Sequence, residues 1–247
     1  MSKRFWKKLA TTVLACVMML ATVFSIGACG GNGGGSTDKP VDFTKLTYIA
    51  FGDSITWGED GETHAQMKKP YPVLVGETLQ LANVENYGKR GATVTFVTTN
   101  KVVMELVQEA PSKADIVSVM IGVNDFAGSQ PLGELGDTSY GTIYGSLNNL
   151  VTQLQEKYKN AFIFFMTPLK QYKSAEVNSA GYQLSDVATA VKEVCGARQI
   201  PVLDLYETGE YSLQTDPTSD GLHPTQTFVA YYTAPKIAQF IQENYSA

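Results

Sequence analysis

Positive charge is scarce in this sequence. The composition is also not that of a disordered chain. The 19 Lys and Arg residues are outnumbered by 24 Asp and Glu residues, which gives a net charge of -5 and a pI near 5.1. Nucleic acids held through phosphate contacts require the opposite balance, so we exclude them as partners. With 44% hydrophobic and only 17% charged residues, the chain has ample material for a core. We find no internal repeat or internal linker and expect one folded domain over residues 41–247.

Charge is also missing from a long apolar run near the start of the chain. Residues 9–28 contain no charged side chain and follow a short segment with four basic residues, which is the layout of a secretory signal. The run is also long enough for an uncleaved membrane helix. It ends in Ile-Gly-Ala-Cys, which resembles the lipobox of bacterial lipoproteins. We therefore expect a signal peptide over residues 1–28 and a lipid on Cys29. The alternative is that Cys29 is only a small residue near a cleavage site.

Cysteine is scarce as well, with three residues in the whole chain. Cys16 would leave with the signal peptide, and Cys195 lies on a predicted apolar helix face, where packing is its expected role. The domain therefore cannot form an internal disulfide. Residues 29–40 are rich in Gly and predict a flexible tether, which as a random coil of about ten residues reaches roughly 20 Å. The domain is thus expected close to a membrane surface without entering the membrane.

Apolar runs and helical periodicities alternate through the rest of the chain. Short continuous apolar runs predict strands buried on both faces, and apolar residues spaced three or four apart predict helices between them. This alternation implies a parallel sheet with helices on both faces, an α/β fold. The predicted strands are 47–51, 84–87, 116–121, 162–166 and 201–205. The predicted helices are about 72–82, 143–158, 184–195 and 224–244, the last kinked by Pro235.

Polar residues follow several of these strands at their carboxyl ends, where ligands of parallel sheets bind. Ser54 follows the first strand, Gly91 lies in a turn after the second, and Asn124 follows the third. Asp220 and His223 follow the fifth strand after a loop. Because the carboxyl ends of parallel strands meet at one edge of a sheet, we expect these residues to lie close together.

These residue types suit acyl transfer to a serine. A serine hydroxyl is a weak nucleophile until a base takes its proton, and imidazole titrates near neutral pH, so His223 is the best candidate base for Ser54. Asp220 is close enough in sequence to fix the imidazole tautomer. The backbone N–H groups of Ser54 and Gly91 and the side-chain amide of Asn124 are candidate donors to an oxyanion. The alternative role for Ser54 is that of a helix N-cap.

Four segments resemble, in order, the sequence blocks of the SGNH (GDSL-like) hydrolase family. They read FGDSIT, NYGKRGAT, GVND and DGLHP, and the similarity extends from Leu46 to the last helix. The resemblance implies a flavodoxin-like three-layer α/β/α sandwich with a five-stranded parallel sheet and no metal or organic cofactor. It also implies that Ser54, Asp220 and His223 form the catalytic triad, with Gly91 and Asn124 at the oxyanion hole.

The second block departs from the family pattern, which often has a small residue before its glycine. Here Lys89 and Arg90 precede Gly91, and they either attract an anionic substrate or form a solvated turn, the interpretation that we favour. Trp57 either lines the cleft or packs under a loop. His64 is expected to be an exposed loop residue, with substrate contact as the alternative.

Structural roles are also considered for three polar residues in these blocks. Asp53 and Asp125 are expected to hold nearby loop groups rather than to act on the substrate. For Asn124 the structural alternative is a turn residue that tolerates left-handed backbone geometry. Two long loops, about Thr56–Tyr71 and Asp125–Gly141, are expected to shape the substrate cleft.

The substrate is expected to be a small ester or an acylated glycan. Our first expectation is a deacetylase of O-acetylated carbohydrate. A lipid anchor would hold it on the extracytoplasmic face of a Gram-positive-like cell membrane. A lysophospholipase or short-chain lipid esterase is the second, because the tether keeps the site near lipid. A non-catalytic glycan-binding module is the third possibility, and the presence of every triad and oxyanion position argues against it.

Overall fold

The computed structural model describes residues 41–96, 101–171, 174–207 and 220–246. These residues belong to the compact unit Val41–Ala247. The expected signal peptide, Cys29 and the tether all lie outside the described residues. Within the described part, none of the helices has both the length and the apolar character needed to span a membrane.

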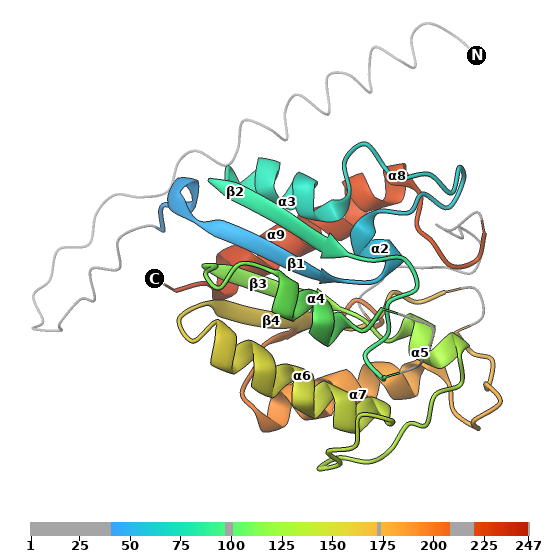
Figure 1. Ribbon diagram of the computed structural model, residues 1–247. Coiled ribbons are helices and arrows are strands. Elements are labelled where there is room, and N and C mark those ends of the chain that lie inside the picture. Colours follow the sequence, from blue (N-terminus) through green and yellow to red (C-terminus); the bar gives the residue numbers. More distant parts are fainter. Residues whose placement is uncertain (1–40, 97–100, 172–173, 208–219, 247) are drawn as a thin grey trace, which may run out of the picture. The chain divides into compact units, whose positions relative to one another are not determined.

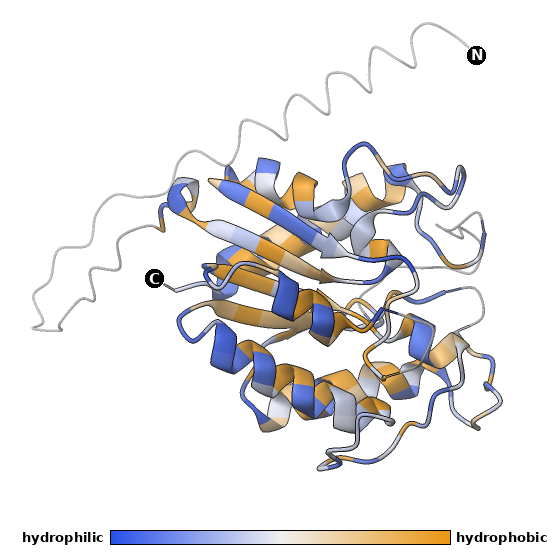
Figure 2. Cartoon of the chain, viewed as in Figure 1, coloured by the Kyte–Doolittle hydropathy of each residue, from blue (hydrophilic) through white to orange (hydrophobic). Residues whose placement is uncertain are grey.

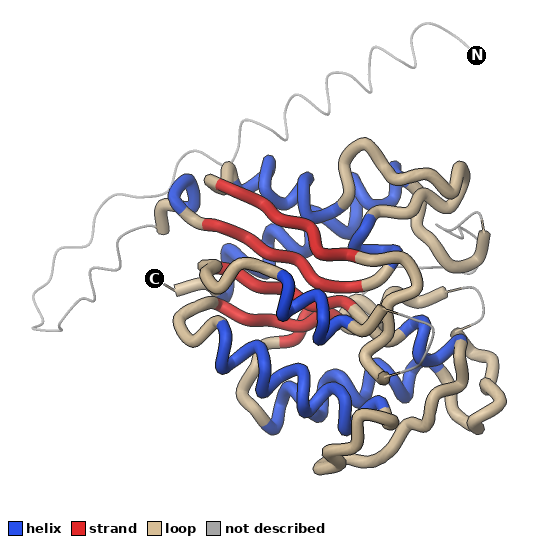
Figure 3. The backbone as a smooth tube through the Cα atoms, in the orientation of Figure 1, coloured by secondary structure: helices blue, strands red, loops and turns tan. Residues whose placement is uncertain are grey.

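Within the described residues, five parallel strands form the central sheet, in the order β2-β1-β3-β4-β5 (Figure 3). This order and the parallel pairing confirm the flavodoxin-like sheet that was predicted. The last strand is shorter than the predicted 201–205. The strands are β1 (Thr47–Gly52), β2 (Asn83–Gly88), β3 (Ile116–Met120), β4 (Phe162–Met166) and β5 (Val202–Leu203).

The carboxyl ends of the five strands are in register. Gly52 of β1 pairs with Gly88 of β2 on one side and with Met120 of β3 on the other, and the row continues through Met166 to Leu203. Any residue a few positions beyond each strand therefore emerges along the same edge of the sheet. This register is the reason why segments far apart in the sequence form one site.

Helices cover both faces of the sheet and complete the three-layer α/β/α sandwich (Figure 1). On one face α3 (Tyr71–Leu79) packs against α9 (Ala234–Asn244); on the other, α6 (Ile143–Lys157) packs against α4 (Val103–Glu109) and α7 (Leu184–Ala197). The hydrophobic residues gather along the strands and on the helix sides that face them (Figure 2). Strand β3 is buried along its whole length, as expected for a strand covered on both faces.

Short helical elements lie close to the carboxyl edge. They are α2 (Ser54–Trp57), α5 (Val123–Ala127) and α8 (Gln226–Phe228), and a further turn, η1 (Phe43–Lys45), precedes β1. The first two begin directly beyond β1 and β3, so their first residues are delivered to the strand ends.

The C-terminal helix differs from the single kinked helix that was predicted. After α8 the chain forms a π-helical turn, η2 (Val229–Thr233), and α9 follows it. The N–H of Ala234 donates to the carbonyl of Val229, five residues earlier. Pro235 has no N–H and its ring crowds the preceding turn, so a wider turn accommodates it without ending the helix.

Candidate active site

Ser54 is the first residue of α2, and the turn that presents it is fixed by Asp53. The Asp53 carboxylate accepts the Ile55 N–H at 2.9 Å, which makes Asp53 the N-cap of this helix. The capping role considered for Ser54 therefore belongs to its neighbour, and the Ser54 hydroxyl is available for another partner. The Ser54 residue is only 4% exposed, so that partner must come from the protein or from a molecule in the site.

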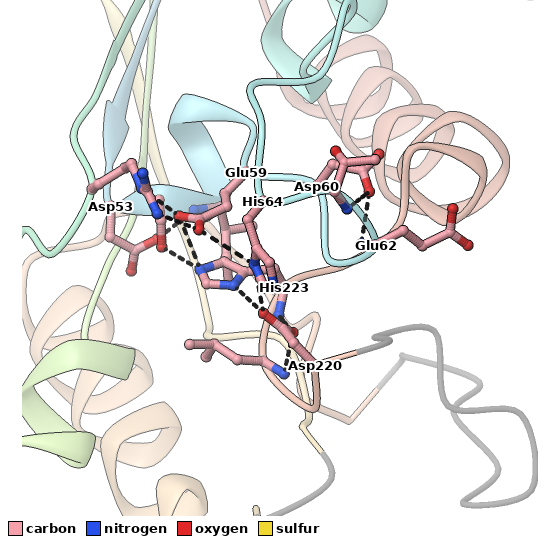
Figure 4. A network of polar contacts seen from close by, with 12 residues as sticks. Asp53, Glu59, Asp60, Glu62, His64, Asp220 and His223 are labelled. Atoms are coloured by element: carbon pink, nitrogen blue, oxygen red, sulfur yellow. Dashed lines mark hydrogen bonds and ion pairs between the residues drawn. The ribbon is translucent and has the colours of Figure 1, made fainter.

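The partner of the Ser54 hydroxyl is His223. Ser54 Oγ lies 2.9 Å from His223 Nε2, and His223 Nδ1 lies 2.7 Å from Asp220 Oδ2. Figure 4 shows His223 and Asp220 of this chain of contacts beside the acidic loop that follows α2. An ionised carboxylate can only accept, so Nδ1 carries the imidazole proton and Nε2 is left to accept the proton of the serine. The three residues thus have the geometry of a nucleophile, its base and the group that orients the base.

Asp220 is held ionised by its surroundings. Partial burial opposes the charged form, but hydrogen bonds from the His223 side chain and from the backbone N–H groups of Leu222 and His223 outweigh it and lower the pKa of Asp220. The same carboxylate therefore fixes both the imidazole and the backbone of the loop that carries it.

Gly91 and Asn124 lie in the segments that follow β2 and β3. Gly91 has φ of 73°, a conformation that favours glycine, and a Cβ built on it would meet no protein atom within 4 Å. The positive φ, rather than crowding by the protein, is therefore the reason for a glycine at this position.

The donors expected for an oxyanion are placed as follows. Asn124 Nδ2 donates to the carbonyl of Ala92 at 2.8 Å, which orients the amide and leaves its second N–H without this partner. Among the described residues, neither the Ser54 nor the Gly91 backbone N–H donates to a protein acceptor. All three donors are therefore available to a ligand oxygen.

Two buried carboxylates support these segments. Asp125 accepts the N–H groups of Val94 and Thr95 and the hydroxyl of Thr95, so it holds the segment that follows Ala92. Burial raises the pKa of Asp125, and burial raises the pKa of Asp53 to about 7. Both acids contact loop groups, as their sequence context suggested, and each carries a cost of desolvation that its hydrogen bonds partly offset.

Glu59 is the residue of this site that sequence reasoning missed. It is 3% exposed, and its Oε2 lies 3.5 Å from His223 Nε2. Arg90 donates to both of its oxygens, from Nε at 2.7 Å and from a terminal nitrogen at 2.6 Å. The unusual cation before Gly91 was the one hint of an acid nearby, but it does not indicate which acid of the loop after Ser54 binds it.

Arg90 therefore has a different role from either one considered for it. Its side chain is 55% exposed, yet its guanidinium binds a buried carboxylate and lies 5.5 Å from the centre of the Trp57 ring. It is neither a simply solvated turn residue nor an unpaired cation that waits for an anionic substrate. Trp57 is half-buried beneath it, and Lys89 is exposed.

His64 lies closer to the candidate triad than expected. Its side chain is 59% exposed, but Nδ1 is 3.8 Å from Glu59 Oε1 and 3.7 Å from Asp220 Oδ2. Among the described residues, Glu59, His64 and His223 bring nitrogen and oxygen atoms within 4.8 Å of one another, as a metal site would. Because Glu59 is bound by Arg90 and His223 Nε2 by Ser54, we assign no metal to this cluster.

Cys195 takes no part in the triad and has a packing role. It is a free thiol, fully buried in α7, and burial raises its pKa to about 12. A thiol held neutral is a poor nucleophile, so its contacts are those of a packing residue.

Several solved structures are similar in fold to this chain. No curated protein matches the chain. A solved structure with 29% sequence identity superposes with a TM-score of 0.77, over 83% of this chain and 99% of its own. A possible lipase from Chitinophaga pinensis is 24% identical, with a TM-score of 0.65 over 81% of this chain and 98% of its own. A carbohydrate acetylesterase family member from Sinorhizobium meliloti is 17% identical, with a TM-score of 0.58 over 80% and 98%.

These structural likenesses show a shared fold, and the family is shown by the sequence itself. The model of the GDSL-like lipase/acylhydrolase family matches residues 50–228, which is more than half of the chain and includes both Ser54 and His223. The resemblance of the four sequence blocks is thereby confirmed. The chain belongs to the GDSL-like lipase/acylhydrolase family and is an enzyme that acts on ester bonds.

Proposed function

We propose that this enzyme cleaves carboxylic esters through an acyl-enzyme formed on Ser54, and that its substrate is an O-acetylated carbohydrate. The observation that carries the mechanism is the unbroken chain of contacts from Ser54 Oγ to His223 Nε2, at 2.9 Å, and from His223 Nδ1 to Asp220 Oδ2, at 2.7 Å. Those distances permit proton transfer without rearrangement of the three side chains.

The first half of the reaction forms the acyl-enzyme. Ser54 Oγ attacks the ester carbonyl carbon while its proton passes to His223 Nε2, and Asp220 stabilises the imidazolium. The negative oxygen of the tetrahedral intermediate accepts hydrogen bonds from the N–H groups of Ser54 and Gly91 and from the Asn124 amide. The C–O bond to the alcohol then breaks, and His223 gives its proton to the departing oxygen.

The second half returns the enzyme to its starting state. Water takes the place of the alcohol, and His223 removes a proton from it as its oxygen attacks the acyl carbon. The tetrahedral intermediate uses the same three donors. Its collapse releases the carboxylic acid and returns the proton from His223 to Ser54 Oγ.

The proposal of a carbohydrate ester rests on the character of the segments around the strand ends. The loop between α5 and α6, which the sequence led us to expect at the substrate cleft, is rich in Gly and polar groups. Fold similarity to the Sinorhizobium meliloti protein is consistent with this substrate class, but at 17% identity it supports only the fold. A polar loop of this kind suits a short acyl group on a hydrophilic alcohol better than a long acyl chain.

The proposed location follows from the N-terminal sequence. A basic segment, an apolar run and Cys29 in a lipobox-like context support secretion followed by lipid anchoring at the outer face of the cell membrane. There the enzyme would meet wall glycans and other extracellular polysaccharides. Metabolic labelling with a fatty acid analogue, comparing the wild-type chain with Cys29→Ala, tests the anchor.

The decisive experiment compares ester hydrolysis by the wild type and by Ser54→Ala. We expect the variant to lose about a thousandfold or more of the rate with p-nitrophenyl acetate. Ser112→Ala is the matched control, because Ser112 is an exposed serine before β3, at the opposite edge of the sheet. Equal rates for Ser54→Ala and the wild type would refute the mechanism and turn attention to glycan binding.

The substrate class is tested separately with an acyl-length series and with acetylated sugars. We expect kcat/KM to fall steeply from acetyl to octanoyl p-nitrophenyl esters, and acetate to be released from acetylated xylan or acetylated amino-sugar polymers. A rate that rises with acyl length, or release of fatty acid from lysophospholipid, would instead support the lipid esterase.

A further inference from the structure

Glu59 is a buried carboxylate with no part in the proton transfers among Ser54, His223 and Asp220. Glu59 Oε2 lies 3.5 Å from His223 Nε2, the same nitrogen that is 2.9 Å from Ser54 Oγ. Nε2 therefore faces the nucleophile and a second acid at once, and Figure 4 shows that acid, Glu59, beside the imidazole. In the resting state Nε2 carries no proton and has nothing to donate to Glu59. Once it has taken the Ser54 proton, it bears an N–H and a share of positive charge beside that carboxylate.

The backbone fixes Glu59 relative to Ser54. The N–H groups of Gly58 and Glu59 both donate to the Ser54 carbonyl, each at 2.9 Å, so the two residues close one helical turn. Gly58 ends α2 with φ of 96°, and a Cβ there would approach Pro70 Cγ to 2.6 Å. Only glycine satisfies both conditions, and Glu59 follows in a bridge with Gln66.

The same loop is attached to the segment that carries His223. The N–H of Gly61 donates to the Pro224 carbonyl at 3.2 Å, and the Gln226 side chain donates to the Lys69 carbonyl at 3.0 Å. The acid and the imidazole are thus held by two connected pieces of backbone, and their separation does not depend on flexible side chains alone.

Arg90 compensates the charge of Glu59. Its two donors bind the two carboxylate oxygens at 2.7 and 2.6 Å in the parallel arrangement that is favourable for this pair. The Trp57 ring lies 5.5 Å from the guanidinium and supports its orientation. A bare carboxylate beside His223 would favour the imidazolium at all times, and an imidazolium cannot serve as a base.

We propose that Glu59 and Arg90 act together as positioning residues that set how readily His223 takes the proton of Ser54. Glu59 stabilises the imidazolium formed in each half-reaction, and Arg90, which binds both oxygens of Glu59, limits that stabilisation. The catalytic role of this pair rests on the proposed acyl-enzyme mechanism, but the electrostatic coupling between Glu59, Arg90 and His223 can be measured without turnover.

Among the residues that the structure describes, the other ionisable groups around His223 are few. Asp220 binds Nδ1 from the same loop, and His64 approaches Asp220 to 3.7 Å and Glu59 to 3.8 Å from the loop after α2. Asp53 lies on the strand side of Ser54, where it accepts the Ile55 N–H. These groups remain unchanged in the comparison below except His64, which is removed from every protein compared.

The test reads the protonation of His223 directly by NMR. The chain has only two histidines, so His64→Asn leaves a single imidazole signal, and asparagine tolerates the positive φ of 55° found there. In this background of the full chain in mild detergent, we compare Glu59→Gln, Arg90→Gln and the double variant. Glu62→Gln is the control, since Glu62 is an exposed acid of the same loop that points away from His223 (Figure 4).

The expected shifts have opposite signs. Glu59→Gln removes the acid and leaves Arg90 uncompensated, so the titration midpoint of His223 falls by about half to one pH unit; Arg90→Gln raises it by a similar amount. The double variant returns close to the starting midpoint, and Glu62→Gln does not move it. The acid limb of kcat/KM for p-nitrophenyl acetate follows the same order.

Midpoints for Glu59→Gln and Arg90→Gln that both stay within about 0.2 pH unit of the parent would overturn the proposal. If Glu59→Gln does not fold, Arg90→Gln alone decides, because Arg90 lies on an exposed turn where a substitution is tolerated. Only an upward shift of the His223 titration midpoint in Arg90→Gln agrees with the proposed coupling. If the NMR shifts appear but no variant hydrolyses esters, the coupling stands and the proposed function fails, so the two outcomes are distinct.

Discussion

Asp220 and His223 are joined twice within one short turn. Asp220 Oδ1 accepts the backbone N–H of His223 at 2.7 Å, and Oδ2 contacts Nδ1 of the same residue at 2.7 Å. One carboxylate therefore orders the loop with one oxygen and the imidazole with the other. The two jobs can be separated by substitution, since only the second one involves the proton of His223.

Asp220→Asn is expected to preserve the conformation of the loop but to lower the rate of ester hydrolysis. The amide oxygen of asparagine can still accept the backbone N–H, whereas an amide cannot stabilise the imidazolium and permits the wrong tautomer of His223. We expect kcat to fall by about 10³- to 10⁴-fold with little change in thermal stability. Steady-state kinetics with p-nitrophenyl acetate and circular dichroism measure the two effects.

Asp60→Asn is the matched control for that loss. Asp60 Oδ1 accepts the backbone N–H groups of Glu62 and Thr63 in a similar turn, and no hydrogen bond joins its carboxylate to His223. Its kcat should stay within about twofold of the wild type, because surface changes away from such a site are usually small. A drop of less than tenfold for Asp220→Asn would contradict the assigned role.

Asn124→Ala tests the oxyanion donors. Asn124 Nδ2 donates to the Ala92 carbonyl, so the amide is oriented before a substrate arrives. Loss of one such donor should lower kcat by about 10²- to 10³-fold and leave KM nearly unchanged, since the oxyanion exists only near the transition state. Asn149→Ala is the control: its exposed amide also donates to a backbone carbonyl, that of Thr138 at 2.9 Å. Equal losses in both variants would indicate a merely structural role.

The sequence predicts the site residues whose positions are determined by the strands of the sheet. Ser54, Gly91 and Asn124 follow strands whose ends are in register at Gly52, Gly88 and Met120, so parallel topology alone brings them to one edge. Asp220 and His223 were accessible because their spacing is local. The assignments of β1, β3 and β4 were right because these strands are continuous apolar runs.

Glu59 was not accessible in this way. Its partner, Arg90, lies 31 residues away on a different turn, and no periodicity or local spacing links them. The acid also stands among several others in a polar loop, and only tertiary structure shows which of them is buried. The π-helical turn before Pro235 was missed for a related reason, because a proline in a helical pattern signals a disturbance but not the form that it takes.

Asp53→Asn should change the pH dependence of stability. Burial raises the pKa of Asp53 to about 7, so between pH 4 and 7 the folded state holds a proton that the unfolded state has released. The contribution of Asp53 to stability therefore falls as pH rises through this window, by at most about 1.4 kcal/mol per pH unit. Asparagine keeps the cap and removes the ionisation. The variant should gain stability relative to the wild type as pH increases from 4.5 to 7, measured by urea unfolding.

Asp42→Asn provides the comparison for that slope. Asp42 also caps a helical turn, but it is exposed and hydrogen bonds from Thr44 and Lys45 lower its pKa. It stays ionised throughout the window, so its variant should show no added slope between pH 4.5 and 7. A slope difference for Asp53→Asn that is no larger than that for Asp42→Asn would argue against the raised pKa.

Asp125→Asn should weaken both the fold and the reaction. Asp125 Oδ2 accepts the Val94 N–H at 3.0 Å, and Oδ1 accepts the N–H and hydroxyl of Thr95. Asparagine presents an NH₂ to one of these donors, so we expect about 1–3 kcal/mol less unfolding free energy. The displaced segment leads to Ala92, which orients Asn124, so kcat should fall as well. Glu134→Gln, an exposed change nearby, should cost less than about 0.5 kcal/mol; wild-type stability in Asp125→Asn would refute this anchoring role.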